Sequence, residues 1–225
     1  MKKQIFTLSL LLLFGVGLSA QPKTVGEPRV IAKTNEPLQR PVWSPDGAKL
    51  LLNNGQWEVS AVGTNLKRVE TLRATSPQKT NPLLQQMIDA PANVTSQIKS
   101  LQSLSGCLIF NPVLSPQGDK IVFQADKGKG LFVINADGSG LRSLGQGERA
   151  TWTPDGKYIV VMIVGDDGHT VTKGELVSIQ VATGAKSSLF ANSKYIALSP
   201  AISPDGKKLA FEEYSSGVIY IMDIQ

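Results

Sequence analysis

Cysteine and histidine are almost absent from this sequence. The chain of 225 residues contains one cysteine, Cys107, and one histidine, His169. A single cysteine cannot form a disulfide within the chain, and these two residues cannot supply the ligands of a zinc site. Cys107 stands between Leu104 and Leu108, so we expect a small buried residue rather than a reactive thiol. The sequence therefore predicts no metal site and no cofactor.

Charge of one sign is nowhere concentrated. Charged residues make up 18% of the chain, the formal net charge is +5, and the basic residues are scattered. A surface that follows nucleic-acid phosphates needs a run or stripe of Lys and Arg, so nucleic acid is not an expected partner. Beyond residue 20, no apolar run approaches the roughly 20 residues of a membrane-spanning helix. We expect no membrane span in the mature chain.

The first 20 residues form a separate segment. They read MKKQIFTLSLLLLFGVGLSA, with two lysines, an apolar run and a small-residue end. This order is typical of a secretory signal peptide, here cleaved before Gln21. A retained membrane anchor is the competing interpretation, but the run is short for a span. Cleavage removes two lysines and no acid, which lowers the formal net charge from +5 to +3. We expect a periplasmic or secreted protein.

Turn formers are plentiful, with 21 glycines and 13 prolines, and they belong to a repeat. One ten-residue phrase occurs four times, as WSPDGAKLLL (43–52), LSPQGDKIVF (114–123), WTPDGKYIVV (152–161) and ISPDGKKLAF (202–211). In each copy an apolar residue ends one strand, Ser or Thr begins a turn, and Pro fixes φ at the first central position. Gly then takes the position that needs a positive φ, and an apolar strand returns.

We interpret the turn residues as structural rather than catalytic. Gln117 stands where the other three copies carry Asp, which a turn tolerates and a shared acid mechanism does not. The predicted repeat turns consist of Ser44, Pro45, Asp46, Gly47, Ser115, Pro116, Gln117, Gly118, Thr153, Pro154, Asp155, Gly156, Ser203, Pro204, Asp205 and Gly206.

A second phrase follows each of the first three copies. Two short β runs joined by turn residues, such as 131–134 and 141–144, have the pattern of a hairpin. Together with the strands around the Pro-Asp-Gly turn they give four antiparallel strands, which is a β-propeller blade. The last copy ends one strand short, and residues 29–33 have the character of the missing outer strand. We predict an all-β, four-bladed propeller over 29–225, closed by this N-terminal strand and preceded by a lead-in over 21–28. Closure within one chain or by pairing two chains is left open.

Residues 74–106 interrupt the array. The prolines of successive copies are 71, 38 and 50 residues apart, so the first interval holds an insertion. Asn81 followed by Pro82 predicts a helix start, Pro91 its end, and Ile98, Leu101 and Leu104 a second helical stretch. We expect a small helical hairpin between blades 1 and 2 that packs on the propeller or caps one channel mouth. The alternatives are a partner-binding element and a degenerate fifth blade.

These phrases carry a family resemblance. WSPDG with its following apolar strand, and LFVINADGSGLRSL at 131–144, resemble the TolB-type, WD-like propeller repeat over nearly all of residues 29–225. The resemblance implies the propeller fold and periplasmic protein partners. It specifies function weakly, because such repeats occur in scaffolds, in peptidase gating domains and in polysaccharide-degrading enzymes. The TolB arrangement has six blades and a separate N-terminal α/β domain, whereas this chain has four copies.

No catalytic constellation stands out in the sequence. There is no Gly-x-Ser-x-Gly elbow, and His169 lies in a polar Asp-Asp-Gly loop that favours a surface position. We therefore expect an exported, non-enzymatic scaffold that binds an envelope protein, with the partner-binding residues unknown. The alternative is a small glycan lyase or hydrolase, or a glycan-binding propeller, which predicts carboxylates such as Asp166 or Asp167 gathered at one channel mouth.

Overall fold

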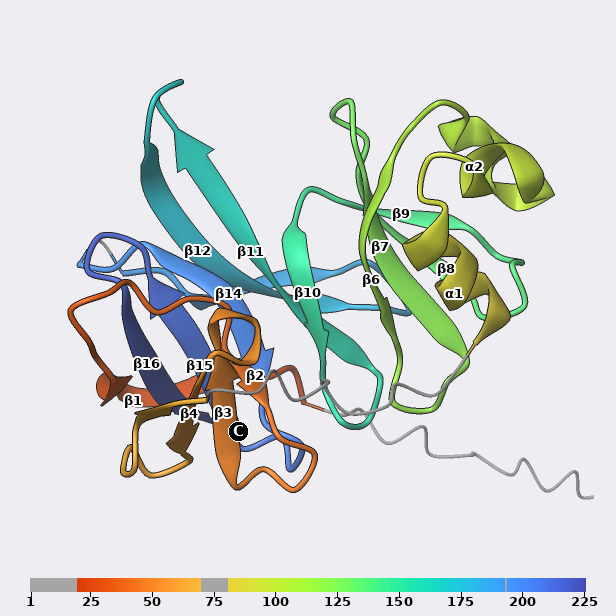
Figure 1. The fold of residues 1–225 in the computed structure, drawn as a ribbon. Helices are drawn as coiled ribbons and strands as arrows, with labels where there is room; N and C mark the ends of the chain where they lie inside the picture. Colours follow the sequence, from red (N-terminus) through yellow and green to blue (C-terminus); the bar gives the residue numbers. More distant parts are fainter. Residues whose placement is uncertain (1–19, 70–80, 193) are drawn as a thin grey trace, which may run out of the picture.

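The computed structural model describes residues 20–69, 81–192 and 194–225. The predicted signal peptide lies outside these ranges except for Ala20, and so do residues 74–80 of the predicted insertion. The described chain folds into four antiparallel sheets of four strands each (Figure 1). This confirms the predicted all-β architecture of four-stranded blades.

The first two sheets follow the chain order of their strands. Sheet 1 consists of β2 (Val42–Trp43), β3 (Lys49–Leu52), β4 (Trp57–Ser60) and β5 (Lys67–Arg68), with the 3-10 turn η1 (Asn53–Gly55) between β3 and β4. Sheet 2 consists of β6 (Ile109–Leu114), β7 (Lys120–Ala125), β8 (Gly130–Asn135) and β9 (Arg142–Gly145).

The other two sheets contain the longest strands. Sheet 3 consists of β10 (Glu148–Trp152), β11 (Tyr158–Asp166), β12 (Val171–Gln180) and β13 (Lys186–Phe190). Its β11–β12 hairpin projects beyond the rest of the molecule (Figure 1). Sheet 4 has the order β1-β16-β15-β14 and consists of β1 (Thr24–Ala32), β16 (Val218–Ile224), β15 (Lys208–Glu213) and β14 (Ala197–Ile202).

The N-terminal strand pairs with the C-terminal strand. In β1, Arg29 lies opposite Ile221 and Val30 opposite Tyr220 in antiparallel register. The missing outer strand of the last blade is therefore supplied as predicted. Strand β1 begins earlier than expected, at Thr24. A register shift between Val25 and Arg29 leaves the residues between them out of the regular pairing, and the pairing continues from Arg29. Closure of the four blades into a ring stays a prediction.

Apolar clusters join the sheets along three of their faces. One contains residues of sheets 3 and 4, another residues of sheets 4 and 1, and a third residues of sheets 2 and 3. Trp43 and Ala201, for example, share the cluster of sheets 4 and 1. The core is thus divided into layers between blades, as face-to-face packing of sheets requires.

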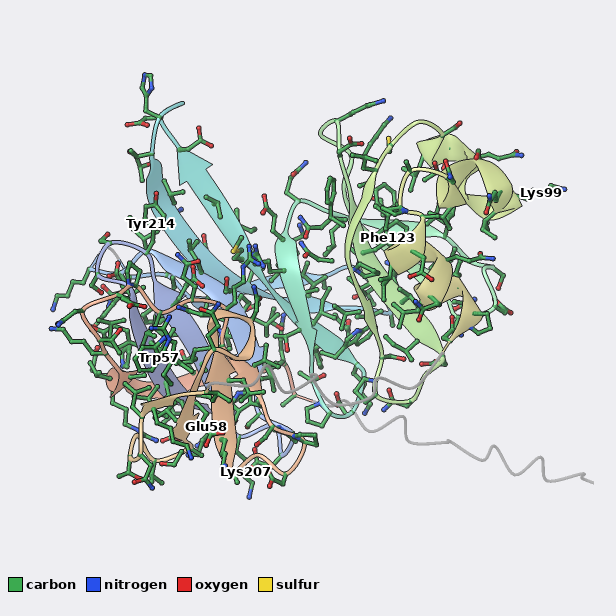
Figure 2. All side chains as sticks on the ribbon, in the orientation of Figure 1. Trp57, Glu58, Lys99, Phe123, Lys207 and Tyr214 are labelled. Carbon is green, nitrogen blue, oxygen red and sulfur yellow. The ribbon has the colours of Figure 1, made fainter. Side chains whose placement is uncertain are left out.

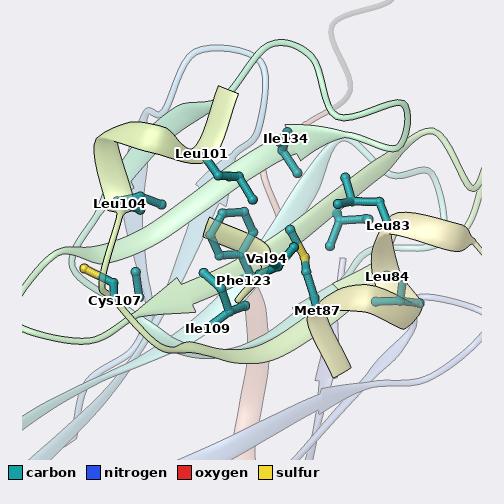
Figure 3. Packing of buried hydrophobic residues seen from close by; sticks show 12 residues of the cluster. Leu83, Leu84, Met87, Val94, Leu101, Leu104, Cys107, Ile109, Phe123 and Ile134 are labelled. Atoms are coloured by element: carbon teal, nitrogen blue, oxygen red, sulfur yellow. The ribbon is translucent and has the colours of Figure 1, made fainter. Parts of the chain in front are cut away.

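A fourth cluster lies between sheet 2 and the insertion. The insertion contains α1 (Pro82–Asp89), α2 (Val94–Gln97) and the 3-10 segment η2 (Lys99–Leu104). Its residues Met87 and Leu101 pack around Phe123 of β7 (Figure 3), whereas Lys99 points away from the sheet (Figure 2). Within the described residues this cluster contains none from sheet 1. The insertion therefore covers the face of sheet 2 opposite sheet 3.

The helical insertion is confirmed, with one difference in its second half. Asn81 accepts a hydrogen bond from the N–H of Leu84 at 3.0 Å, which is the N-cap that its position before Pro82 predicts. The second stretch is not one helix, because Ile98 adopts an extended conformation between α2 and η2. No strand lies between 81 and 108 in the described chain, so this part is not a degenerate blade. Among all described residues, no helix is long and apolar enough to cross a membrane.

Candidate functional site

The inner strands of all four sheets surround one cavity. It has a volume of about 970 Å³ and is bounded by β2, β6, β10 and β14 with the residues that flank them. Its wall is mainly apolar and rich in proline, and it is lined by Pro41, Val42, Trp43, Pro45, Val113, Pro116, Ala150, Thr151, Trp152, Pro154, Pro200, Ala201, Ile202, Ser203 and Pro204. We call this cavity the channel, and neither it nor the adjoining cavity described below is lined by a carboxylate.

The four Pro-Asp/Gln-Gly turns lie at one end of the channel, which we call the turn mouth (Pro45, Pro116, Pro154 and Pro204). Each turn closes with a backbone hydrogen bond from Gly to Ser or Thr, such as Gly206 N–H to the Ser203 carbonyl at 2.8 Å. Asp205 accepts hydrogen bonds from the Ser203 hydroxyl at 2.5 Å and from the Lys207 N–H at 3.0 Å. These bonds hold the pKa of Asp205 below its ordinary value.

Asp46 and Asp155 make the same pair of contacts in their own turns. In the second copy, the Ser115 hydroxyl donates to Asp119 at 2.8 Å instead. The side chain of Gln117 reaches the Pro154 carbonyl of the neighbouring turn, at 3.4 Å from Nε2. The structure thus places the four turns together, with their acidic side chains engaged in local hydrogen bonds.

Two tryptophans connect neighbouring sheets at the channel wall. Trp43 Nε1 donates to the Ala201 carbonyl at 3.0 Å, which joins sheet 1 to sheet 4. Trp152 Nε1 donates to the Val113 carbonyl at 3.1 Å, which joins sheet 3 to sheet 2. Each tryptophan ends its inner strand just before the repeat turn, so its ring lines the channel while its N–H is satisfied.

The opposite end of the channel is built from strained backbone. Arg40, Asn111, Arg149 and Ser199 each have a left-handed φ, between 47° and 52°. A non-glycine residue in this conformation costs roughly 1–3 kcal/mol, and such residues cluster at functional sites. In β6, β10 and β14 they lie at register shifts of the inner strand. We call these four residues the bulge mouth, and they line a second cavity of about 220 Å³ that adjoins the channel.

Three side chains of neighbouring sheets accept the N–H groups of the bulge residues. Glu212 Oε2 accepts from the Arg40 N–H at 2.7 Å, and Gln124 Oε1 from the Arg149 N–H at 3.3 Å. The third acceptor is Met162 Sδ, 3.4 Å from the Ser199 N. Each acceptor lies on the second strand of the sheet that comes before the sheet of the bulge residue, with sheet 4 coming before sheet 1. These contacts between sheets hold the backbone of the bulge residues in its strained conformation.

The sequence analysis did not identify the bulge mouth, although a positional signal exists. Each bulge residue stands three positions before the apolar residue that opens the repeat phrase, and each acceptor stands ten positions after that residue. The residue types at these positions differ from copy to copy. A search for a repeated motif therefore passes over them.

Electrostatics set the bulge mouth apart from the turn mouth. Burial, and then the positive charge of Arg40, lower the pKa of Arg149, while Glu212 and Glu148 oppose this effect. Within the described residues, neither guanidinium of Arg40 and Arg149 makes a hydrogen bond or an ion pair. Two arginines thus line a shared cavity, and neither side chain has a direct partner among the described residues.

The carboxylates named in the sequence analysis do not gather at the channel. Asp166 and Asp167 lie at the exposed end of the β11–β12 hairpin, together with His169. Hydrogen bonds from the Thr170 and His169 N–H groups hold the pKa of Asp167 below its usual range. Cys107 is buried with the insertion cluster. In the described ranges, no group of three or more His, Cys, Asp and Glu residues is placed to hold a metal ion.

Comparisons with known proteins point to propellers. No family model matches the sequence, and no curated protein matches it. Among solved structures, the chain is similar to the β-propeller domain of the trilobed protease from Pyrococcus furiosus (16% identity over 52% of this chain and 39% of that one, TM-score 0.42). It is also similar to TolB from Acinetobacter baumannii (16% identity, 87% and 45% coverage, TM-score 0.36).

A third similar structure is an oligogalacturonate lyase in complex with manganese (12% identity over 85% of this chain and 78% of that one, TM-score 0.35). The chain spans less than half the length of the first two of these proteins. TolB, whose repeats the sequence resembles, is thus among the similar solved structures.

Proposed function

We propose that this protein is an exported, non-enzymatic β-propeller scaffold that binds a protein partner in the cell envelope through its channel. The single observation that carries the proposal is the channel itself, to which all four inner strands contribute. Pockets that are largely apolar, with a few convergent polar groups at one end, are the common form of ligand sites. The signal-like segment 1–20 supports export to the periplasm or beyond.

The insertion is a less favourable place for the partner. Its apolar face already packs on sheet 2, where Met87, Leu101 and Leu104 are almost fully buried. Removing the insertion would expose Phe123 and other core residues, so its loss would change folding and binding together. A substitution inside the channel tests the proposal more cleanly.

Ala150 offers such a substitution because it lines both the channel and the adjoining cavity. We expect Ala150→Trp to fill the cavity, to leave the unfolding transition cooperative, and to abolish capture of a stoichiometric partner from cross-linked envelope extracts. Val62→Trp is the matched control, because Val62 is 73% exposed in the turn between β4 and β5. It should capture the partner as the unsubstituted protein does.

Two outcomes would contradict the proposal. Equal capture by the folded Ala150→Trp variant would show that the partner does not use the channel. Absence of any specific partner with the unsubstituted protein and the control would favour the alternative, a glycan-binding or carbohydrate-active propeller. Glycan-array binding that Ala150→Trp abolishes would then support that alternative.

A further inference from the structure

The bulge mouth presents two arginines whose main chain is held in place by the fold. The backbone N–H of Arg40 is bound by Glu212, and that of Arg149 by Gln124, so each residue is held at its main chain. Asn111 is held as well, because its Nδ2 donates to Gln124 Oε1 at 2.7 Å. A site whose backbone is already fixed loses little conformational freedom on binding.

Within the described residues, the side chains of Arg40 and Arg149 make no hydrogen bond or ion pair, although the charges of Glu212 and Glu148 act on Arg149 from a distance. Glu212 binds the main chain of Arg40 and not its guanidinium, and the other side chains of the second cavity are neutral. Arg40, in the segment before β2, and Arg149 of β10 therefore line one cavity of about 220 Å³, and their positive charges lie close enough to act on each other. Arginine in such a position binds carboxylate through two parallel hydrogen bonds.

The wall beyond this mouth favours a peptide over a sugar chain. Pro41, Pro200 and Val113 continue from the second cavity into the channel. The indole N–H groups of Trp43 and Trp152 are already bonded to carbonyls, so this wall offers few donors for sugar hydroxyls. Proline-rich, aromatic-lined grooves are a known form of site for extended prolyl segments.

We infer that the bulge mouth binds a carboxylate of an acidic, extended peptide segment between Arg40 and Arg149, with the neighbouring apolar residues of that segment in the channel. The inference rests on the proposed function and deepens it by naming the chemistry of the partner. Failure of the inference can be told apart from failure of the proposed function, because a partner can use the channel without using the two arginines.

The test uses the full mature chain and a short probe peptide. The probe is acetyl-Pro-Leu-Glu-Glu-amide, and its counterpart has Gln in place of both Glu residues. Binding is followed by fluorescence of Trp43 and Trp152 in a Trp57→Phe background. This background substitution is mild because Trp57 Nε1 is buried without a hydrogen-bond partner in the described chain.

We expect saturable binding of the acidic probe that weakens with added salt. Arg40→Gln and Arg149→Gln should each weaken it about tenfold or more, as loss of a charge-assisted hydrogen bond predicts. Arg40→Lys should recover part of the affinity, since it restores the charge without the planar fork. Arg29→Gln, which changes an exposed arginine on β1, should have no effect.

Three results would overturn the inference. They are equal binding of the acidic and neutral probes, unchanged binding in both Arg→Gln variants, and tighter binding of trigalacturonate or inorganic phosphate than of the acidic probe. Trigalacturonate binding that requires both arginines would place a glycan carboxylate at this mouth. Failure of the probe with successful capture by the unsubstituted chain would leave the channel proposal standing and remove the two-arginine site.

Discussion

The two mouths of the channel are made from the same four strands, yet they are specified in different ways. At the turn mouth the four copies repeat nearly one sequence, and their polar side chains bond within the turn or to the next turn. At the bulge mouth the copies carry Arg40, Asn111, Arg149 and Ser199, which share a backbone conformation and little else. Figure 2 shows the two ends of one strand, with Lys207 beside the turn mouth and Tyr214 at the other end of β15.

The difference teaches where function can lie in a repeat protein. Where the copies agree, the shared residues meet a shared backbone requirement. Where they differ while the backbone stays strained, the side chains are free to serve a ligand. The predictions below compare the two ends, beginning with the largest expected effect.

Glu213→Ala should cause the largest loss of stability, at the bulge end. This carboxylate is 6% exposed and accepts hydrogen bonds from the Ser215, Ser216 and Ile196 N–H groups and the Ser216 hydroxyl. Its removal takes away the charged acceptor of four partly buried hydrogen bonds, so the free energy of unfolding in urea should fall by about 3 kcal/mol. Asp223→Ala, which breaks a surface pair with Lys208, should change it by less than about 0.5 kcal/mol.

The same carboxylate should make stability depend on acid. Burial acts to raise the pKa of Glu213, but the Ser216 hydroxyl and the backbone donors outweigh burial and lower the pKa from 4.5. A lowered folded pKa gives stability that is complete above the unfolded value and is lost as the pH falls through the folded value. The stability difference between the unsubstituted protein and Glu213→Gln should therefore shrink as the pH falls below about 4.5. A constant difference down to pH 2.5 would contradict this.

Gly206→Ala should be the next most damaging change, at the turn mouth. Gly206 has a φ of 73°, and an added Cβ would lie 3.2 Å from Pro154 Cδ of the next turn. Conformational strain and this contact should cost about 2 kcal/mol in urea unfolding. Gly168→Ala is the control, because Gly168 has a similar φ of 87° and an added Cβ would meet no atom nearby. Its loss of stability measures the conformational strain without the contact. Equal losses would show that the turns are not packed together.

Trp152→Phe should be costlier than Trp57→Phe. Both remove an indole N–H, but that of Trp152 bonds to the Val113 carbonyl, and that of Trp57 has no partner in the described chain. The difference in unfolding free energy should be about 1 kcal/mol, the usual net value of one hydrogen bond. A difference near zero would mean that this bond does not hold sheets 2 and 3 together.

Gln117→Asp should have the smallest effect. It restores the residue of the other three copies and loses one long hydrogen bond to the Pro154 carbonyl. We expect the free energies of unfolding of the two proteins to agree within about 0.5 kcal/mol. A larger loss would show that Gln117 is specific to the junction of sheets 2 and 3, and would weaken the view that the turn mouth is only structural.

Sequence patterns predicted the repeat-encoded parts of the structure. The Pro-Asp-Gly phrases, the hairpins and the N-terminal outer strand follow from local turn chemistry and strand alternation. The Asn81 cap and α1 follow from local rules as well. The break at Ile98 does not, because two short helical segments pack on sheet 2 in a way that tertiary contacts decide.

The bulge mouth could not be predicted by the same means. Its left-handed residues are Arg, Asn and Ser, and nothing in those residue types requires a positive φ. The conformation is imposed by acceptors on neighbouring blades, such as Glu212 for Arg40, which lie far away in the sequence. Only the three-dimensional arrangement brings the two arginines to one cavity.

Photocross-linking from the two ends of β15 tests the central claim most directly. A photoreactive phenylalanine analogue would replace either Tyr214, 47% exposed at the bulge end, or Lys207, exposed beside the turn mouth. In envelope extracts, we predict a discrete protein adduct from position 214 that Arg149→Gln diminishes, and none from position 207. An adduct only from 207, or equal adducts from both positions, would contradict the assignment of binding to the bulge mouth.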